Sequence, residues 1–239
     1  MRIRTYVGLL KQAFRKPVVN PIAIEIANIR IRRTITIDTI NIAQQHYREQ
    51  TLGDDPQGAT KYCDYAYWMR TNIIRAARLR LHKASKLKIL DLGCGAGYFV
   101  AVCRYLGHEA LGADLPPDEM NLLDATVYPI LTAALGRGEM ILPLKISRFT
   151  KLDIVGEFDL ITAFMICFNS HPTPDVWGVS EWEFFLDDVR RHLRPEGRLF
   201  LQLNHDSKCY PHLHYYSPEQ LKMFSRFGVV DRDEILIRK

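Results

Sequence analysis

The feature that most constrains the fold is a glycine-rich segment near the middle of the chain, ILDLGCGAGYF at residues 89–99. An apolar run that leads into closely spaced glycines and then into a helical pattern predicts a buried strand, a tight turn and a helix. Glycine gives the backbone conformations that other residues avoid and lets it approach a ligand closely. The segment therefore predicts a strand–turn–helix unit that binds a ligand through its backbone.

The spacing of these glycines separates two kinds of nucleotide site. A dinucleotide fingerprint has its third Gly or Ala three positions after the second glycine. That position is Tyr98 here, whereas the third glycine is Gly97, so the pattern is G-x-G-x-G. The spacing disfavours a nicotinamide-dependent oxidoreductase, which remains an alternative.

Strand and helix patterns alternate along the rest of the chain. Nearly continuous hydrophobic strands between amphipathic helices predict a parallel sheet covered on both faces. Residues 229–238 predict two short strands about a turn. The expected fold class is α/β, a doubly wound, Rossmann-like, mostly parallel sheet with an antiparallel C-terminal edge. The strands are expected at 88–92, 110–115, 158–168 and 198–204, and the helices at 60–81, 98–106 and 181–193.

Local signals mark the ends of the later helices. Capping boxes are expected at Ser180–Glu183 and at Ser217–Gln220, the second with Pro218 at the first helical position. The turn Leu193-Arg194-Pro195-Glu196-Gly197 is expected to close one of these helices, and Gly228 the other.

The N-terminal segment has the weakest pattern. Pro17 and Pro21 would interrupt an early helix, residues 29–37 alternate in the manner of a strand, and residues 53–58 form a dense turn signal. We therefore expect an N-terminal extension and helical cap over 1–84 and a ligand-binding domain over 85–239.

Charge is concentrated in the N-terminal segment. The net charge of +5, from 32 basic and 27 acidic residues, is too small to indicate a nucleic-acid binder by itself. The first 35 residues, however, contain eight basic residues and only one acid, Glu25. A solvated helix face is the interpretation we favour. Attraction to RNA, to an anionic acceptor or, as peripheral contact, to anionic lipid head groups are the alternatives.

Other composition features exclude several classes. No stretch approaches the roughly 18 consecutive apolar residues that a spanning helix needs, and the N-terminus lacks the pattern of a secretory signal. The five cysteines contain no C-x-x-C pair, so neither a disulfide framework nor a metal site is expected. A cytoplasmic location is the expectation.

An acidic residue lies at the position where a nucleotide cofactor needs one. Asp114 ends the predicted strand that follows the glycine helix, about 20 residues beyond the glycines. A carboxylate there can accept hydrogen bonds from both hydroxyls of a ribose. Asp114 is therefore the predicted ribose ligand.

These residues resemble the class I S-adenosylmethionine-dependent methyltransferase family, from about Leu87 to the C-terminus. The segment 91–97 is similar to the family's first motif, residues 157–164 to its fourth strand, and residues 193–200 to the turn into its fifth. The resemblance implies an enzyme with S-adenosyl-L-methionine as cofactor. It also implies that the three glycines lie beside the methionine part, that Asp91 organises the amino-group site, and that residues 146–149 lie near the adenine. In this last loop, Ser147 and Arg148 replace the usual acid. The expected cofactor contacts are Asp91, Gly93, Cys94, Gly95, Gly97, Tyr98, Asp114, Leu115, Arg148, Phe149 and Phe164.

The reaction needs mainly alignment, because the methyl on a sulfonium is already activated. An oxygen acceptor can also need a general base, and the loops after the fourth and fifth strands lie at the sheet edge where ligands bind. His171 and His205 in these loops are the candidate bases, His171 first; structural loop histidines are the alternative. Cys94 is expected to be a small contact rather than a nucleophile.

The expected function is methylation, at oxygen, of a small molecule or of a glycan- or lipid-linked precursor. Asn169 opens the loop after the fourth strand, but the family's amino-methylating signature, Asn or Asp followed by Pro-Pro and an aromatic, is missing. Methylation of RNA or protein, with RNA not favoured, is one alternative, and a non-catalytic S-adenosylmethionine-binding protein is another. Tyr62, Tyr65, Tyr67 and Trp68 are expected either to cover the site as a lid or to pack in the core, which we favour for Tyr62 and Tyr65.

Overall fold

The computed structural model describes residues 20–32, 62–120, 122–136, 140–166, 168, 176–204 and 215–239. The chain divides into two compact units, one within residues 17–145 and the other within 146–239. Each unit is described by itself.

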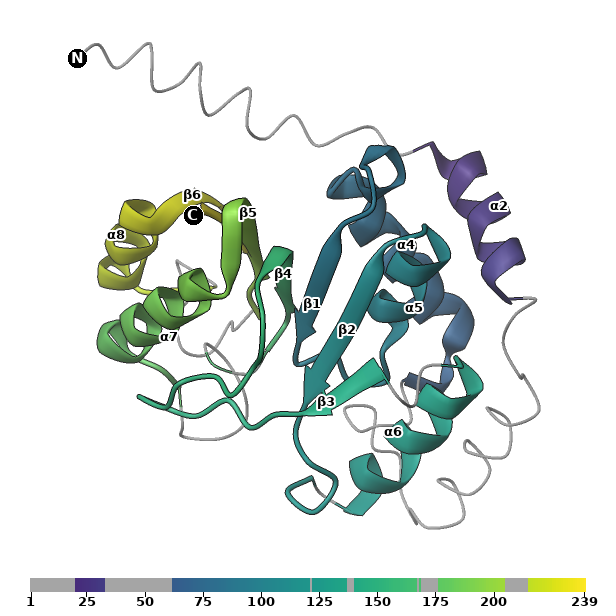
Figure 1. The fold of residues 1–239 in the computed structure, drawn as a ribbon, viewed down its shortest axis with the longest axis horizontal. Helices are drawn as coiled ribbons and strands as arrows, with labels where there is room; N and C mark the ends of the chain where they lie inside the picture. Colours follow the sequence, from purple (N-terminus) through teal and green to yellow (C-terminus); the bar gives the residue numbers. More distant parts are fainter. Residues whose placement is uncertain are drawn as a thin grey trace. The chain divides into compact units, whose positions relative to one another are not determined.

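Three parallel strands form the sheet of the first unit, β1 (Lys88–Leu92), β2 (Glu109–Asp114) and β3 (Ile141–Pro143), with β2 between the other two (Figure 1). The bounds of β1 are those predicted, and β2 is displaced by one residue at each end. Leu92 pairs with Ala113, so the glycine turn begins beside the end of β2. The sequence pattern had left β3 inside a long connection.

Four of the helices of this unit are α4 (Tyr65–Arg78), the short η2 (Leu81–Lys83), α5 (Tyr98–Tyr105) and α6 (Leu122–Ala134). Helix α4 begins at Asp64, whose side chain accepts a hydrogen bond from the Tyr67 amide at 3.1 Å. It packs against α5, which follows the glycine turn and buries six consecutive residues, 98–103. The helix expected over 60–81 is therefore present but shorter.

A further helix, α2 (Pro21–Arg32), lies alongside α4 (Figure 1). The expectation that Pro21 interrupts a helix is wrong, because proline fits the first helical position, where its missing N–H has no partner to lose. Asn20 accepts hydrogen bonds from the amides of Ile22 and Ala23 at this helix start. Residues 29–32 belong to this helix rather than to a strand; residues 33–37 lie outside the described part.

The second unit contains β4 (Phe158–Phe164), β5 (Leu193–Gln202), β7 (Glu234–Arg238) and β6 (Gly228–Asp231), in that spatial order. β4 and β5 are parallel, and β7 pairs antiparallel with both β5 and β6. The predicted mostly parallel α/β fold with an antiparallel C-terminal edge is confirmed. β4 is shorter than predicted and is followed by Met165, which has a positive φ of 58°.

Two helices, α7 (Val179–Arg191) and α8 (Pro218–Phe227), pack against each other in this unit (Figure 1). The predicted capping box of α8 is confirmed by reciprocal hydrogen bonds between Ser217 and Gln220 at 3.2 and 2.9 Å. The predicted cap at Ser180 is wrong: the N-cap is Gly178, whose amide donates to Glu181 Oε2 at 3.0 Å. The turn expected to end α7 instead forms the start of β5, with a shift in its register against β4.

Aromatic residues fill the core of the second unit around Trp182. Trp182 and Phe224 are fully buried, and their ring centroids lie 5.2 Å apart. The Phe168 and Trp177 rings stack at 3.7 Å, and the Trp177 amide donates to the Phe168 carbonyl at 2.7 Å. Gln220 donates from its side chain to the Trp177 carbonyl, which joins α8 to this cluster. Among the helices that the structure describes, none is long and apolar enough to cross a bilayer.

Candidate functional site

The glycine turn between β1 and α5 depends on left-handed backbone. Gly93, Gly95 and Gly97 have φ angles of 65°, 54° and 78°, a region that side-chain-bearing residues rarely adopt. The amides of Gly93 and Cys94 both donate to the Ala113 carbonyl, at 2.8 and 3.1 Å. The turn is therefore fixed to the end of β2 rather than free in solvent.

Asp114 completes this connection. Its Oδ2 accepts a hydrogen bond from the Gly95 amide at 2.5 Å, and its Oδ1 accepts one from the Leu115 amide at 2.8 Å. The side chain is half-buried, and Leu115 beside it is 38% exposed. A carboxylate has about four acceptor sites, so two backbone donors orient it without exhausting its capacity. This chemistry fits the diol of a ribose.

The glycine turn packs closely against β2. Among the described residues, a Cβ added to Gly95 would meet only the Tyr128 side chain, at 3.9 and 4.0 Å, which is ordinary contact. Against β2 the packing is tight: a Cβ on Gly112 of β2 would lie 2.5 Å from Cys94 Sγ. The turn is thus supported by β2.

Asp91 is buried at the end of β1, with 3% of its surface exposed. A buried carboxylate needs compensation from charge or hydrogen bonds, and Arg75 of α4 supplies charge. Burial lowers the pKa of Arg75, and the attraction of Asp91 opposes that shift. Arg75 also donates to Asn72 Oδ1 at 3.1 Å. Arg75 lies on a helix and Asp91 on a strand, so local sequence patterns did not predict this interaction.

Aromatic residues line the same region from three segments. The Tyr98 hydroxyl donates to the Tyr62 carbonyl at 2.6 Å. The Tyr62 ring lies 4.8 Å from Trp68 and 5.4 Å, edge-on, from Tyr128 of α6. Tyr67 by contrast is 59% exposed. Tyr62 therefore packs within the first unit; the contribution of Tyr128 was not predicted, because α6 itself was missed.

The Cys94 thiol is held in its neutral form. Burial raises its pKa well above the ordinary value, and the negative charges of Asp114 and Asp91 raise it further. The thiolate is the nucleophilic form of cysteine. These shifts support the expectation that Cys94 is a packing or contact residue.

The remaining predicted site residues belong to the second unit. Arg148 donates to the Val176 carbonyl at 3.0 Å. Phe149 has a positive φ of 53°, is 55% exposed, and meets Phe184 edge-on at 5.8 Å. Phe164 at the end of β4 is buried against Phe200, with ring centroids 5.8 Å apart. His171 and His205 lie outside the described residues.

A strand, a glycine turn and a helix, with an acid at the end of the neighbouring parallel strand, define a nucleotide-cofactor-binding α/β protein. The particular family follows from the sequence as a whole, since the profile of a methyltransferase domain family matches residues 65–229. The chain belongs to this methyltransferase family. The predicted family, enzyme class and cofactor, S-adenosyl-L-methionine, are thereby confirmed, and the match begins at the start of α4.

Solved structures with a similar fold include several methyltransferases. A ribosomal protein L11 methylase from Lactobacillus delbrueckii subsp. bulgaricus is 17% identical, with 71% of this chain and 77% of that chain covered and a TM-score of 0.43. An amino pentose methyltransferase from Micromonospora echinaspora is 21% identical, covering 64% and 52%, with a TM-score of 0.41. The N-methyltransferase NodS from Bradyrhizobium japonicum is 15% identical, covering 72% and 97%, with a TM-score of 0.44.

The family assignment rests on the match to the methyltransferase domain family. The similar solved structures do not identify the methyl acceptor of this chain. This chain corresponds to between about half and nearly all of their lengths. No curated protein matches the chain significantly by sequence.

Proposed function

We propose that the protein is a cytoplasmic enzyme that transfers a methyl group from S-adenosylmethionine to an oxygen of a small molecule or of a glycan- or lipid-linked precursor. The hydrogen bond from the Gly95 amide to Asp114 is the main support for the cofactor site in this proposal. It holds the ribose-binding candidate and the glycine turn in one arrangement.

Each group of the first unit has a task in this proposal. The backbone of Gly93, Gly95 and Gly97 gives close approach for the methionine part, and Asp114 accepts the ribose hydroxyls. Asp91, with its charge balanced by Arg75, organises the region that receives the amino group. The bound cofactor supplies a methyl on a positively charged sulfur, already activated for displacement. The chain therefore has to align the acceptor and exclude water.

Two features of the sequence support oxygen as the acceptor atom. The segment after β4 lacks the Asn/Asp-Pro-Pro-aromatic signature of amino methylation, and it contains His171. Histidine titrates near neutral pH and can remove a hydroxyl proton as the methyl is transferred. We assign this task to His171 and keep His205, after β5, as the second candidate.

Calorimetric titration tests the cofactor assignment. The native chain should bind S-adenosylmethionine and not NAD, and Asp114→Ala should weaken binding about tenfold or more because a charge-assisted hydrogen-bond acceptor is lost. Asp118→Ala removes an exposed acid four residues away and serves as the matched control. Binding of NAD without binding of S-adenosylmethionine would contradict the proposal.

A transfer assay tests the assignment of the base. With labelled cofactor and fractions of a cell extract as acceptors, His171→Ala should lower turnover about 100-fold, within the range of a lost general base. Its affinity for the cofactor should stay close to that of the native chain. Unchanged turnover would remove His171 as the base, whereas product formed only on RNA, with steep salt dependence, would favour the RNA alternative.

A further inference from the structure

Helix α2 carries isoleucine residues on two opposite sides. Its inner side, formed by Ile24, Asn28 and Ile31, is buried, and the helix packs on α4. Ile22, Ile26 and Ile29 repeat the same i, i+4, i+7 spacing on the other side, and they are 69%, 46% and 50% exposed. With 3.6 residues per turn, these two sets point in opposite directions from the helix axis. One stripe of isoleucine thus completes the fold and the other faces outward.

The outer stripe differs from ordinary surface hydrophobics. Single exposed apolar side chains are normal on a protein surface, whereas a contiguous apolar patch marks an interaction site. In the part of the chain that the structure describes, the other large exposed hydrophobics are not spaced as a helix stripe. The three isoleucines therefore need an apolar environment that the described residues of the first unit do not give them.

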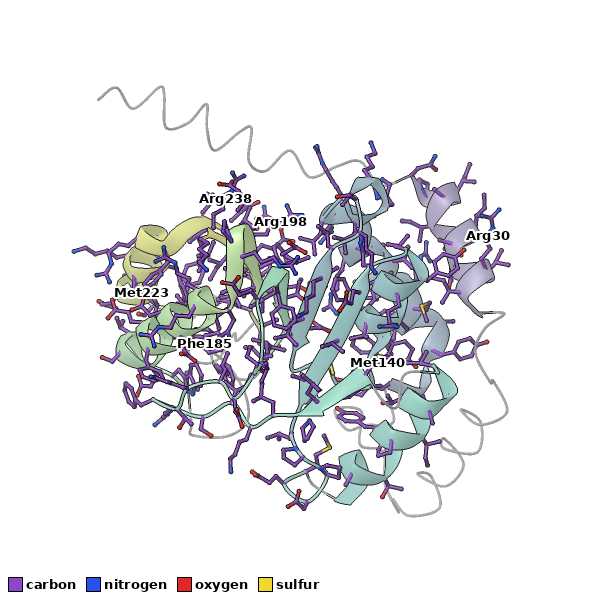
Figure 2. The ribbon with its side chains drawn as sticks, viewed as in Figure 1. Arg30, Met140, Phe185, Arg198, Met223 and Arg238 are labelled. Atoms are coloured by element: carbon purple, nitrogen blue, oxygen red, sulfur yellow. The ribbon has the colours of Figure 1, made fainter. Side chains whose placement is uncertain are left out.

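The charges around this stripe indicate what that environment is. Glu25, the only acid among the first 35 residues, forms an ion pair with Arg70 Nε of α4 at 3.1 Å. Arg30 is exposed and projects outward from the helix beside the stripe (Figure 2). The residues that precede α2 include Arg2, Arg4, Lys11, Arg15 and Lys16. The described outer side of α2 is accordingly apolar with an exposed arginine beside it, and the sequence before the helix is basic.

We propose that the outer side of α2 docks the protein on the surface of an anionic membrane. Ile22, Ile26 and Ile29 enter the boundary between head groups and acyl chains, and Arg30 pairs with a lipid phosphate or carboxylate. The helix lies on the membrane and does not span it, because its 12 residues are too few for the hydrocarbon core. Its inner side remains packed on α4. This docking does not depend on the acceptor of the methyl group.

RNA fits this surface less well. Single-stranded nucleic acid is bound by basic grooves with aromatic side chains for base stacking, and the stripe consists of aliphatic side chains. Lipid binding uses both the aliphatic and the basic components, which is why we favour it.

Co-sedimentation of the full chain with phosphatidylcholine vesicles, with and without phosphatidylserine, tests the proposal. The native chain should bind the vesicles that contain phosphatidylserine, and less so at high salt. The triple variant Ile22→Ser, Ile26→Ser, Ile29→Ser should lower the partition coefficient about tenfold or more. Arg30→Gln should lower it about fivefold. Val155→Ser, which changes an aliphatic side chain that is 91% exposed in the second unit, should have no effect.

Several outcomes would overturn the proposal. These are absence of native binding to phosphatidylserine vesicles, or equal binding by the native chain and the triple variant. A native dimer that the triple variant abolishes, seen by sedimentation, would assign the stripe to a second copy. A lower unfolding temperature of the triple variant would assign it to a covering segment of the same chain. Unchanged circular dichroism of the variants keeps these outcomes distinct from misfolding.

Discussion

Gly112 in β2 illustrates how the lack of a side chain at one glycine leaves room for the neighbouring glycine turn. A Cβ there would lie 2.5 Å from Cys94 Sγ and 2.7 Å from Ile141 Cδ1. Gly112 is not among the glycines with positive φ. The requirement at this position is therefore space for the neighbouring turn and strand, not an unusual backbone conformation.

Gly112→Ala should lower the free energy of unfolding by about 1–3 kcal/mol, the usual cost of overpacking a core. It should also weaken cofactor binding, because Cys94 belongs to the turn and must move. Gly136→Ala is the control: a Cβ there meets nothing within 4 Å, so only its positive φ is strained. Urea unfolding and calorimetric titration measure the two effects. A Gly112→Ala variant with native stability and affinity would show that the turn tolerates displacement.

The sequence allowed only some site residues to be predicted. Asp114 could be placed at the end of a strand beside the glycines because strand and turn patterns are local. Arg75, Gly112 and Tyr128 could not, because each acts through contact with a segment distant in sequence. His171 and His205 remain predictions.

At the scale of elements, local sequence signals predicted a helix or strand correctly where local interactions determine its ends. β1 and α8 match prediction because an apolar run and a capping box each determine an end directly. Helix α2 was missed because its isoleucines favour strands, while packing on α4 stabilises the helix. The N-cap of α7 is Gly178, two residues before the predicted Ser180, because Glu181 provides the acceptor for the Gly178 amide.

The pairing of β5 with β7 places two basic residues opposite each other. Arg198 of β5 lies opposite Arg238 of β7, and both are labelled in Figure 2. Burial lowers the pKa of Arg198, and the charge of Arg238 lowers it further. Like charges directly opposite each other destabilise a strand pair.

Arg238→Gln should therefore raise the free energy of unfolding by about 0.5 kcal/mol, within the range of cross-strand pair energies. The gain should shrink as salt increases, because Arg238 is exposed and screened. Arg238→Lys keeps the charge and should give no gain. Chemical denaturation at low and high salt measures the difference. Equal stabilisation by Gln and Lys would attribute the effect to side-chain packing instead.

At the scale of the whole molecule, two buried thiols and one buried tyrosine hydroxyl resist ionisation. Burial, the largest cause in each case, raises the pKa values of the Cys94 and Cys103 thiols and of the Tyr98 hydroxyl above their ordinary values. Asp91 adds repulsion at both thiols. The folded chain thus holds these protons at a pH where the unfolded chain releases them.

Stability should consequently fall at alkaline pH. The contribution is complete below the unfolded pKa of the thiols, near pH 8.5, and is lost as the pH rises above it toward the folded values. The urea midpoint should be nearly constant from pH 7 to about pH 8 and decline above about pH 9. The double variant Cys94→Ala, Cys103→Ala should decline less steeply, whatever its stability at pH 7. Identical slopes in the two chains would contradict this origin.

The hydrogen bond between the Gly95 amide and Asp114 makes the Gly95 amide proton a probe of the site. A hydrogen-bonded amide exchanges with solvent only when that bond opens, so its exchange rate measures how firmly the carboxylate holds the turn. A ligand that tightens or loosens this bond would alter that one rate without any need for turnover. Occupation of the site could then be followed in the intact chain by nuclear magnetic resonance while the methyl acceptor is still being sought.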